Sequence, residues 1–314
     1  FSLSICMIIS AIVIYNQIRF IQNKPLGFQK DNLVQLAIEG ELAKPGKLAL
    51  LKKELHATGV VTYATEYANS FAANGGSVTG EVYWPGKPAN TSISFNHRSI
   101  GYDFTKTVGA KLLEGRDFSP AFAADSLNSV ILNESAVKTM QLKNPVGNQI
   151  KWEGRELTVI GVLKNYSNSS MVSVPQPTLF YYGIKPSTML LLRLNPTQNL
   201  SRSTQLIKEL TQRINPFYPV NLQFIDQEMA DKLKTEKLLS TLSSLFGCFA
   251  IFISCLGLLG LAFYMAEQRN REISIRKVLG ANLKSILILL NKDFIKLVVL
   301  SNIIAIPIAY ILIN

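Results

Sequence analysis

An uncharged run of 29 residues, from Leu238 to Ala266, constrains this chain of 314 residues more than any other feature. As a helix the run would be about 44 Å long at 1.5 Å per residue, whereas the hydrocarbon layer of a bilayer is about 30 Å thick. Buried helices of soluble proteins rarely exceed about 20 residues. The run therefore predicts a membrane helix that is tilted or extends beyond the bilayer.

Two further uncharged blocks lie at the ends, Phe1–Ile18 and Leu297–Asn314, and Pro307 interrupts the second. No basic region precedes the first block and no small-residue cleavage site follows it, which argues against a signal peptide. We expect truncated membrane helices within 1–23 and 294–314, so that the chain is a piece of a longer protein.

The net charge of +11 first suggests nucleic acid or membrane as a partner. Residues 19–237 hold 25 Lys/Arg and 18 Asp/Glu, and residues 267–293 hold 6 and 3. Because basic and acidic residues are interleaved, with no dense basic stripe among aromatics, we exclude nucleic acid. The short loop 267–293 carries the denser positive charge, but a similar number of Lys and Arg residues flanks the membrane on the opposite side. Charge alone therefore leaves the orientation open.

The stretch 24–232 is predicted to be a folded α+β domain. Its first part predicts a strand at 33–38, a helix at 47–57 and a strand at 60–64. Its last part repeats this order, with a strand at 189–194, a helix at 201–214 capped by Ser201, and a strand at 220–225. We expect the two β-α-β units to pack together as one porter-like subdomain.

Between these units, residues of about 70–180 predict an inserted β-rich subdomain. Strands are expected at 81–86, 92–98 and 157–163. A short helix is expected at 133–142, with Asn133 as its N-cap.

No catalytic constellation is recognisable. His56 and His97 are the only histidines and lack further ligands at metal-ligand spacing, so we expect both to be solvated polar residues. The segment Gly280–Ser285 lacks the glycine that precedes lysine in a Walker A motif, so we expect no ATP site and no cofactor on this chain. The cysteines at 6, 248 and 255 all lie in apolar runs, which leaves 19–237 without a disulfide.

The segment after the long run, residues 267–281, mixes dense charge with apolar residues. Read as a helix, it places Ile275, Val278 and Leu279 on one face, and Gly280 is placed to end it. Such an amphipathic helix either lies at the membrane surface or docks into a groove on a soluble partner, and the pattern alone favours neither.

Several motifs resemble the FtsX/MacB-like permeases of ABC transporters, especially those of Bacteroidetes type. The segment Glu272–Ala281, EISIRKVLGA, closely resembles their cytoplasmic signature, and Cys255–Ala262 and Ala266–Arg269 are also similar. The middle region is similar to the MacB-type periplasmic core at the following motifs: Tyr102–Phe104, Gly109, Gly115–Phe118, Asn133–Ala136, Pro145–Gly147 and Ile160–Val162.

This resemblance implies an orientation and a division of the chain. A membrane helix in 1–23 leads to a periplasmic domain at 24–232, and a stalk with a membrane helix returns over 233–266. A cytoplasmic coupling loop then covers 267–293, before a further helix at 294–314. The polar stretch 226–237 is expected to lengthen the stalk.

The resemblance also implies a mechanism, called mechanotransmission. A separate cytoplasmic ATPase subunit binds the ATP, the coupling loop docks on it, and the long helix carries movement to the periplasmic domain, for export or extraction of a periplasmic substrate. The expected partners are this ATPase, the lipid bilayer of the inner membrane, a second permease unit, and a periplasmic adaptor or outer-membrane channel. The implied coupling residues are Arg271, Glu272, Ile273, Ile275, Arg276, Lys277, Val278, Leu279, Gly280 and Ala281.

An alternative with the same domain is a membrane-anchored periplasmic receptor or regulator of a cell-envelope enzyme, without transport. Two departures from the family pattern stand out: Ser274 replaces a usual glycine, and Lys164-Asn165-Tyr166 replaces a frequent Lys-Asp-Phe.

Overall fold

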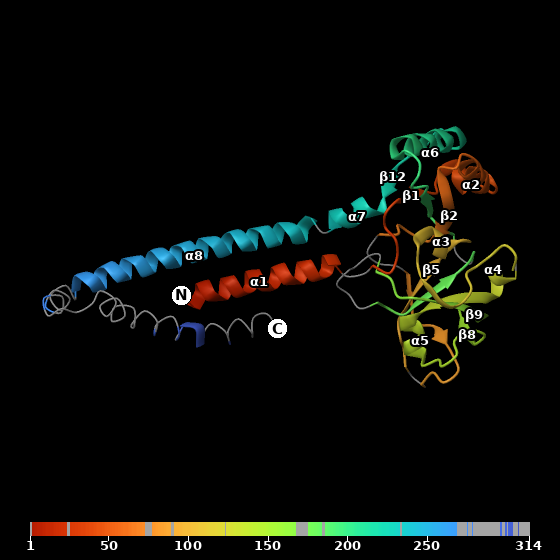
Figure 1. Cartoon of the computed structure of the whole chain (residues 1–314). Coiled ribbons are helices and arrows are strands. Elements are labelled where there is room, and N and C mark those ends of the chain that lie inside the picture. Colours follow the sequence, from red (N-terminus) through yellow and green to blue (C-terminus); the bar gives the residue numbers. More distant parts are fainter. Residues whose placement is uncertain are drawn as a thin grey trace. The chain divides into compact units, whose positions relative to one another are not determined.

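The computed structural model describes residues 2–23, 26–72, 77–88, 91–122, 124–167, 175–183, 186–232 and 234–268, and beyond these only residues 275, 278, 296, 299, 301–303 and 307. The chain divides into two compact units. One unit is Lys24–Lys232, and the other joins Phe1–Asn23 to Leu233–Asn314. Figure 1 shows both units, with some of their elements labelled.

The helical unit contains α1 (Ser2–Asn23) and α8 (Lys234–Gln268). Within α8, residues 238–265 form a span of 28 residues with a mean hydropathy of 2.4, of which only 11% is buried. A buried soluble helix would be mostly covered, so this exposure supports a membrane helix. It is the one helix of sufficient length and apolarity in the part of the chain that the structure describes.

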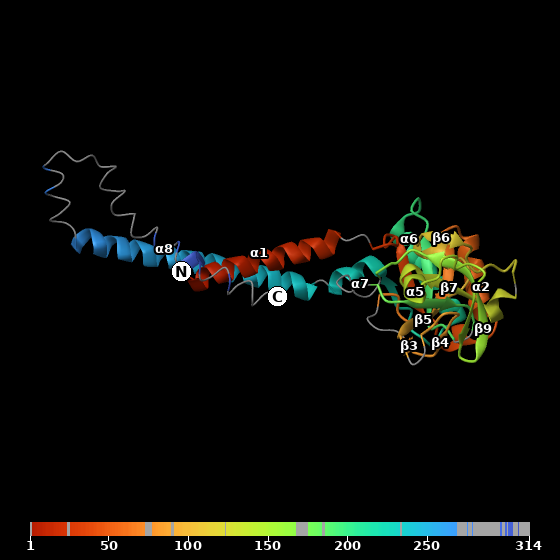
Figure 2. The ribbon, with the colours of Figure 1, turned by 90° about the horizontal axis from the view of Figure 1, so that it is seen from below.

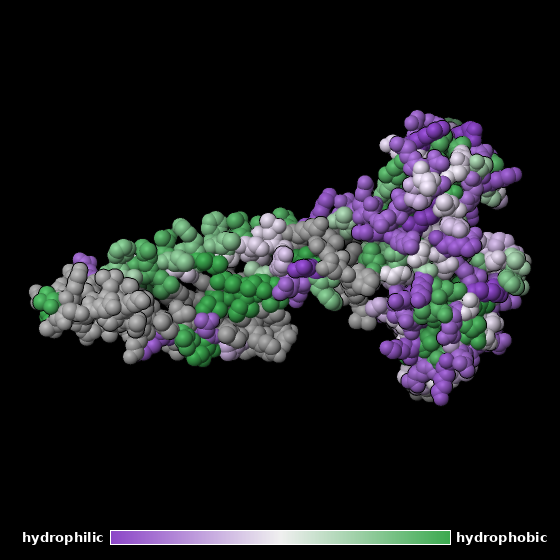
Figure 3. Space-filling view, viewed as in Figure 1, coloured by the Kyte–Doolittle hydropathy of each residue, from purple (hydrophilic) through white to green (hydrophobic). Residues whose placement is uncertain are grey.

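Helices α1 and α8 lie side by side in both ribbon views (Figures 1 and 2). The helices come close at Gly247, where an added Cβ would lie in ordinary van der Waals contact with the Cβ of Ala11, at 3.7 Å. The space-filling view shows apolar residues over the length of α8, whereas polar residues predominate on the visible face of the folded domain (Figure 3). A helix that is apolar on nearly every side is suited to lipid rather than to water.

The first sheet of the folded domain has four strands, in the order β12-β1-β11-β2. Each of its two β-α-β units is split by a strand of the other unit. β11 lies between β1 and β2, and β1 lies between β11 and β12. All neighbouring strands are antiparallel. This is the ferredoxin-like arrangement. The elements are β1 (Leu33–Ala37), η1 (Gly40–Ala43), α2 (Lys47–Ala57), β2 (Val61–Tyr67), β11 (Met189–Leu194), α6 (Leu200–Ile214) and β12 (Leu222–Phe224).

The topology confirms that the two predicted units form one subdomain. Helices α2 and α6 contact each other, and they bury Leu51, Leu55 and Ile207 against one face of the sheet. Each such side chain, once fully buried, contributes about 1.5–3 kcal/mol of transfer free energy. One prediction was wrong: α6 begins at Leu200, and Asn199 rather than Ser201 caps it by accepting from the Arg202 N–H.

The inserted β-rich subdomain is also confirmed, as an eight-stranded sheet in the order β3-β5-β10-β7-β9-β8-β4, with β6 paired to β9. Two of its neighbouring pairs are parallel, β5 with β10 and β7 with β9. Its strands are β3 (Ser77–Thr79), β4 (Val82–Tyr83), β5 (Phe95–Ser99), β6 (Leu112–Gly115), β7 (Ser129–Asn133), β8 (Gln149–Trp152), β9 (Arg155–Leu163) and β10 (Thr178–Tyr181).

Three short helices lie between these strands in the chain: α3 (Phe104–Val108), α4 (Asp125–Asn128) and α5 (Glu134–Met140). α4 and α5 contact strands of the inserted sheet, whereas α3 contacts β2 and β11 of the four-stranded sheet. Asn133 caps α5 as predicted, because its side chain accepts from the Ala136 N–H. The strand predicted at 81–86 shrinks to Val82–Tyr83. The strand predicted at 220–225 stops at Phe224, since Ile225 begins another helix, α7 (Ile225–Lys232).

Candidate functional site: the segments that connect the folded domain to the helical unit

The chain leaves the folded domain through α7, which packs on β1 and β12. Ile225 and Met229 of α7 are buried, at 0% and 3% exposure, and their spacing of four places them on one helix face. α7 ends at Lys232 and α8 begins at Lys234, so one residue separates the two helices in the chain. α7 is therefore the last element of the folded domain before the membrane helix in the chain.

A buried amide on β1 forms the polar part of this attachment. Gln35 is only 1% exposed, and its Nε2 lies 2.9 Å from Ser70 Oγ, 2.8 Å from Gln223 Oε1 and 2.8 Å from Glu228 Oε2. The hydroxyl of Ser70 also donates to Glu228 Oε1, at 3.2 Å. The amide thus joins the loop after β2, strand β12 and helix α7.

The orientation of the Gln35 amide follows from its other end. The main-chain N–H of Phe71, a fully buried residue, donates to Gln35 Oε1 at 2.8 Å. If the amide were flipped, its NH2 group would face the Phe71 N–H, a donor against a donor. Its oxygen would then face the Glu228 carboxylate, an acceptor against an acceptor. The oxygen therefore faces Phe71, and both N–H groups face the three acceptor oxygens.

The chain enters the domain through residues 26–32, which Arg193 on β11 holds. Its guanidinium donates to the carbonyl oxygens of Gln29, at 2.8 Å, and of Asp31. A third bond runs from Nε to the Thr107 carbonyl at the end of α3, at 2.8 Å. Burial lowers the pKa of Arg193 below its ordinary value, yet a guanidinium keeps its charge at neutral pH.

Gln35 and Arg193 lie on the same face of the same sheet. Leu33 pairs with Arg193, and Gln35 pairs with Leu191, in the antiparallel register of β1 and β11. Directly paired residues share a face, and residues two apart along a strand do so as well. The opposite face packs under α2 and α6, so both connections of the domain are fixed to the face that these helices leave open.

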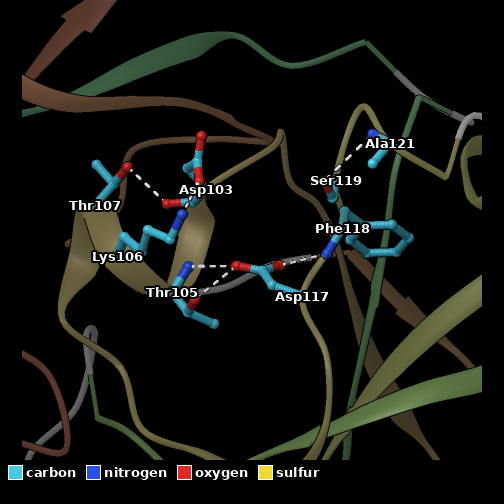
Figure 4. Close-up of polar contacts among 8 residues, drawn as sticks. All are labelled: Asp103, Thr105, Lys106, Thr107, Asp117, Phe118, Ser119 and Ala121. Carbon is cyan, nitrogen blue, oxygen red and sulfur yellow. Dashed lines mark hydrogen bonds and ion pairs between the residues drawn. The ribbon is translucent and has the colours of Figure 1, made fainter.

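Helix α3, which receives one bond from Arg193, is itself held by the partly buried carboxylate of Asp117 (Figure 4). Asp117 Oδ2 accepts from the Thr105 N–H at 2.9 Å and from the Thr105 hydroxyl at 2.7 Å, and Oδ1 accepts from the Phe118 N–H at 2.8 Å. Burial raises the pKa of Asp117 above its ordinary value of 3.8, although these hydrogen bonds act in the opposite direction.

Comparison with known proteins decides the family. The model of the MacB-like periplasmic core domain matches residues 2–210, about two thirds of the chain, and that of the FtsX-like permease C-terminal region matches residues 244–314. This chain belongs to the FtsX/MacB-like permease family. Membership supports a permease component of an ABC transporter and a membrane protein with an extracellular domain.

Curated relatives of the permease include the macrolide export ATP-binding/permease proteins MacB of Neisseria gonorrhoeae and Aggregatibacter actinomycetemcomitans. The first is 23% identical over 210 residues, covering 63% of this chain and 32% of the relative. The second is 25% identical over 206 residues, covering 62% and 32%. The chain thus spans about a third of the length of the curated relatives it matches. The Bacteroidetes type stays a prediction.

Two solved structures are similar in fold. The periplasmic region of MacB from Actinobacillus actinomycetemcomitans is 17% identical, covers 68% of this chain and 98% of its own, and has a TM-score of 0.47. The extracellular domain of the ABC-type transporter YknZ from Gram-positive bacteria is 12% identical, covers 61% and 98%, and has a TM-score of 0.42.

The family motifs of the permease meet in pairs within the folded domain. Asp117, from the Gly115–Phe118 motif, bonds Thr105 next to the Tyr102–Phe104 motif. Gly115 pairs with Gly161 between β6 and β9. A Cβ on Gly161 would lie 2.5 Å from the Arg116 carbonyl oxygen, so this crossing requires glycine. These motifs build the domain, and the bonds they form are structural.

The departure at Lys164-Asn165-Tyr166 is accommodated. Asn165 Oδ1 accepts from the Ser135 N–H at 3.2 Å, as an aspartate oxygen could. The main-chain N–H of Asn165 donates to Glu134 Oε2 at 2.8 Å. The ring of Tyr166 stacks on Phe71 at 5.9 Å, as phenylalanine could. Burial, together with Tyr67, raises the pKa of the Tyr166 hydroxyl well above 10.0.

The coupling residues of the permease that were predicted from the sequence lie largely outside the described residues. Ile275 and Val278 are described; both are helical and exposed, at 61% and 87%. Their role in coupling stays a prediction. The other predicted coupling residues lie outside the described part of the chain: Arg271, Glu272, Ile273, Arg276, Lys277, Leu279, Gly280 and Ala281.

The two histidines differ in outcome. His56 is exposed, as predicted. The prediction for His97 was wrong, because it is 5% exposed, with Nδ1 3.3 Å from Tyr181 Oη and its ring centroid 5.0 Å from that of Trp152. Among the described residues, no group of three or more His, Cys, Asp or Glu side chains is arranged to hold a metal ion. His97 is therefore a core residue of the inserted subdomain.

Proposed function

We propose that this chain couples ATP hydrolysis by a separate cytoplasmic ATPase to a conformational change of domain 24–232 in the periplasm. The observation that carries the proposal is the route from α7 to α8. A helix attached to the sheet by Glu228 and a buried apolar face is followed, after one residue, by a helix of 35 residues. At 1.5 Å per residue that helix is about 52 Å long, well beyond the roughly 30 Å of a hydrocarbon layer.

In this proposal the loop 267–293 docks on the ATPase through the predicted coupling residues, with Ile275 and Val278 in a groove of the partner. The exposure of both apolar side chains supports this role. The chain resides in the inner membrane, works as a dimer of permease units, and acts with a periplasmic adaptor or an outer-membrane channel. Export or extraction of a periplasmic substrate is the transport step we propose.

Reversal of charge in the coupling loop tests the proposal. The double variant Arg276→Glu with Lys277→Glu should lower ATPase co-purification by about tenfold or more, since like charges placed across an interface cost several kcal/mol. The matched control is Arg202→Glu with Lys208→Glu, which makes the same charge change at exposed positions of α6. ATPase that co-purifies in unchanged amount with normal activity would refute the coupling role.

Transport itself is tested in cells. If transport accompanies coupling, the loop variant should abolish efflux of a substrate while the chain stays at its normal level in the membrane. Loss of ATPase binding with unchanged efflux would instead favour the receptor or regulator without transport.

A further inference from the structure

We propose that Gln35 and Glu228 form a coupling clamp, through which movement of α7 reaches the four-stranded sheet. This inference rests on the proposed function and adds the residues that perform one step of it. Gln35 and Glu228 are positioning residues, because they act through the helix and the sheet rather than on a substrate.

The position of Gln35 supports the clamp. It lies in β1, between β11 and β12, and is 1% exposed. An amide buried this deeply is costly unless it is hydrogen-bonded. A leucine at this position would suit a simple core, but it could not bond α7, β12 and the loop at Ser70 at once. The amide therefore ties together segments separated by 35, 188 and 193 residues in the chain.

The number of acceptors makes the clamp reversible. The Gln35 amide has two N–H groups, but three acceptor oxygens lie within 2.8–2.9 Å of its nitrogen, on Ser70, Gln223 and Glu228. When α7 withdraws Glu228, both N–H groups of the buried Gln35 amide still have acceptors. The one donor that loses its acceptor is the hydroxyl of Ser70, which is only partly buried. What is lost are the two charge-assisted contacts to the carboxylate, from Gln35 and from Ser70, and such contacts are the stronger kind of hydrogen bond.

The clamp can thus open without the cost that usually prevents a buried polar network from rearranging. Its two arrangements differ in whether Glu228 of α7 is bonded to Gln35. A physical account of coupling requires an element with two arrangements that both sites bias. In the closed arrangement, a displacement of α7 pulls on Gln35 and, through its oxygen, on the Phe71 N–H.

The same surplus explains why Glu228 can be removed without unfolding the domain. In Glu228→Ala, Ser70 and Gln223 still satisfy Gln35, and Ile225 and Met229 still bury the apolar face of α7. The variant is therefore expected to fold and to lose only the polar link between α7 and Gln35. Glu228→Gln keeps an acceptor oxygen for Gln35 and is the conservative variant that should retain coupling. Asp226→Ala removes a carboxylate from the same helix, one whose hydrogen bond is to the neighbouring Gln227 N–H, and serves as the matched control.

The test is hydrogen exchange on the full chain in lipid nanodiscs with its ATPase, with and without ATP and vanadate. In the wild type, nucleotide should change exchange both in 225–232 and at the amide of Phe71. In Glu228→Ala, the change at Phe71 should fall by about fivefold or more, while that in 225–232 persists. Glu228→Gln and Asp226→Ala should match the wild type. Exchange without nucleotide should be the same in all variants, which verifies folding.

A response at Phe71 in Glu228→Ala equal to that of the wild type would overturn the clamp. A second variant pair guards against a merely local effect. Gln35→Glu places two carboxylates together and should abolish the response at Phe71. The double variant Gln35→Glu with Glu228→Gln exchanges the two groups and should restore it. If this double variant folds but does not restore the response, the clamp is also overturned. If nucleotide changes exchange nowhere in domain 24–232 of the wild type, the proposed function fails as well.

Discussion

Replacement of Asp117 is the sharpest test of how domain 24–232 is built. Its two carboxylate oxygens have separate tasks, since Oδ2 accepts two bonds from Thr105 and Oδ1 accepts one from the N–H of Phe118. Asparagine can perform only one of these tasks, because its amide nitrogen is a donor. Alanine can perform neither.

The expected loss of stability follows from the number of hydrogen-bond donors that each substitution leaves without an acceptor. In Asp117→Asn, the oxygen keeps Thr105 and the amide nitrogen faces Phe118, so one donor loses its acceptor. Such a loss costs about 1–3 kcal/mol. In Asp117→Ala, two main-chain donors lose theirs, but the folded state no longer buries a charge, which offsets part of the cost. We expect a decrease in the free energy of unfolding of about 1–2 kcal/mol for asparagine and about 2–4 kcal/mol for alanine.

The pH dependence separates this explanation from a simple packing defect. Because burial raises the pKa of Asp117 above 3.8 in the folded state, the folded domain binds this proton more tightly than the unfolded chain. Its contribution to the free energy of unfolding is therefore fully present below pH 3.8 and is lost as the pH rises through the folded pKa. The asparagine variant lacks this term, so the advantage of the wild type over it should shrink with rising pH in that window.

Urea unfolding of the fragment 24–232 is the assay, since this unit has its own hydrophobic cores. Trp84 and Trp152 are buried in it and report unfolding by fluorescence. The control is Asp103→Asn, which removes an exposed carboxylate paired with Lys106 and should cost no more than about 1 kcal/mol. An advantage of the wild type that stays constant or grows with pH would refute the reasoning.

Two further changes test the frame around the connecting segments. Arg193→Met removes three hydrogen bonds to main-chain carbonyls and should lower the free energy of unfolding by about 2–4 kcal/mol. Proteolysis within 26–32 should be faster in this variant than in the control Arg202→Met. Equal cleavage of the two variants would contradict the proposed attachment. Gly161→Ala places a Cβ 2.5 Å from the Arg116 carbonyl oxygen and should cost about 1–3 kcal/mol, measured by urea unfolding; a variant as stable as the wild type would show that the crossing can widen.

Elements with a strong local period could be predicted from the sequence. The helix at 47–57 and the strand at 189–194 have the predicted bounds, because their apolar spacing and flanking turns are local signals. Strands of two to four residues, such as β4 and β6, were shortened or missed. Their pairing partners, not their own residues, decide that they are strands.

His97 shows how a local pattern can mislead. Its neighbours Asn96 and Arg98 suggest a solvated segment, but Phe95, His97 and Ser99 alternate inward along β5. The period of two was a usable signal, since residues two apart share a face. What could not be derived was the aromatic surrounding of Tyr181 and Trp152, which comes from strands distant in sequence.

The contacts of Gln35 and Arg193 could not be predicted from the sequence either, because they too depend on segments that are distant in the chain. A glutamine within the apolar run Leu33–Ala37 hints at a buried polar group, yet its partner Glu228 is 193 residues away. Only the antiparallel register of β1 and β11 places Gln35 and Arg193 on one face. If α7 moves as we propose, Arg193 holds residues 26–32 on the same face, so we expect a nucleotide-driven change in packing to be concentrated at Leu191, the buried residue of that face that pairs with Gln35.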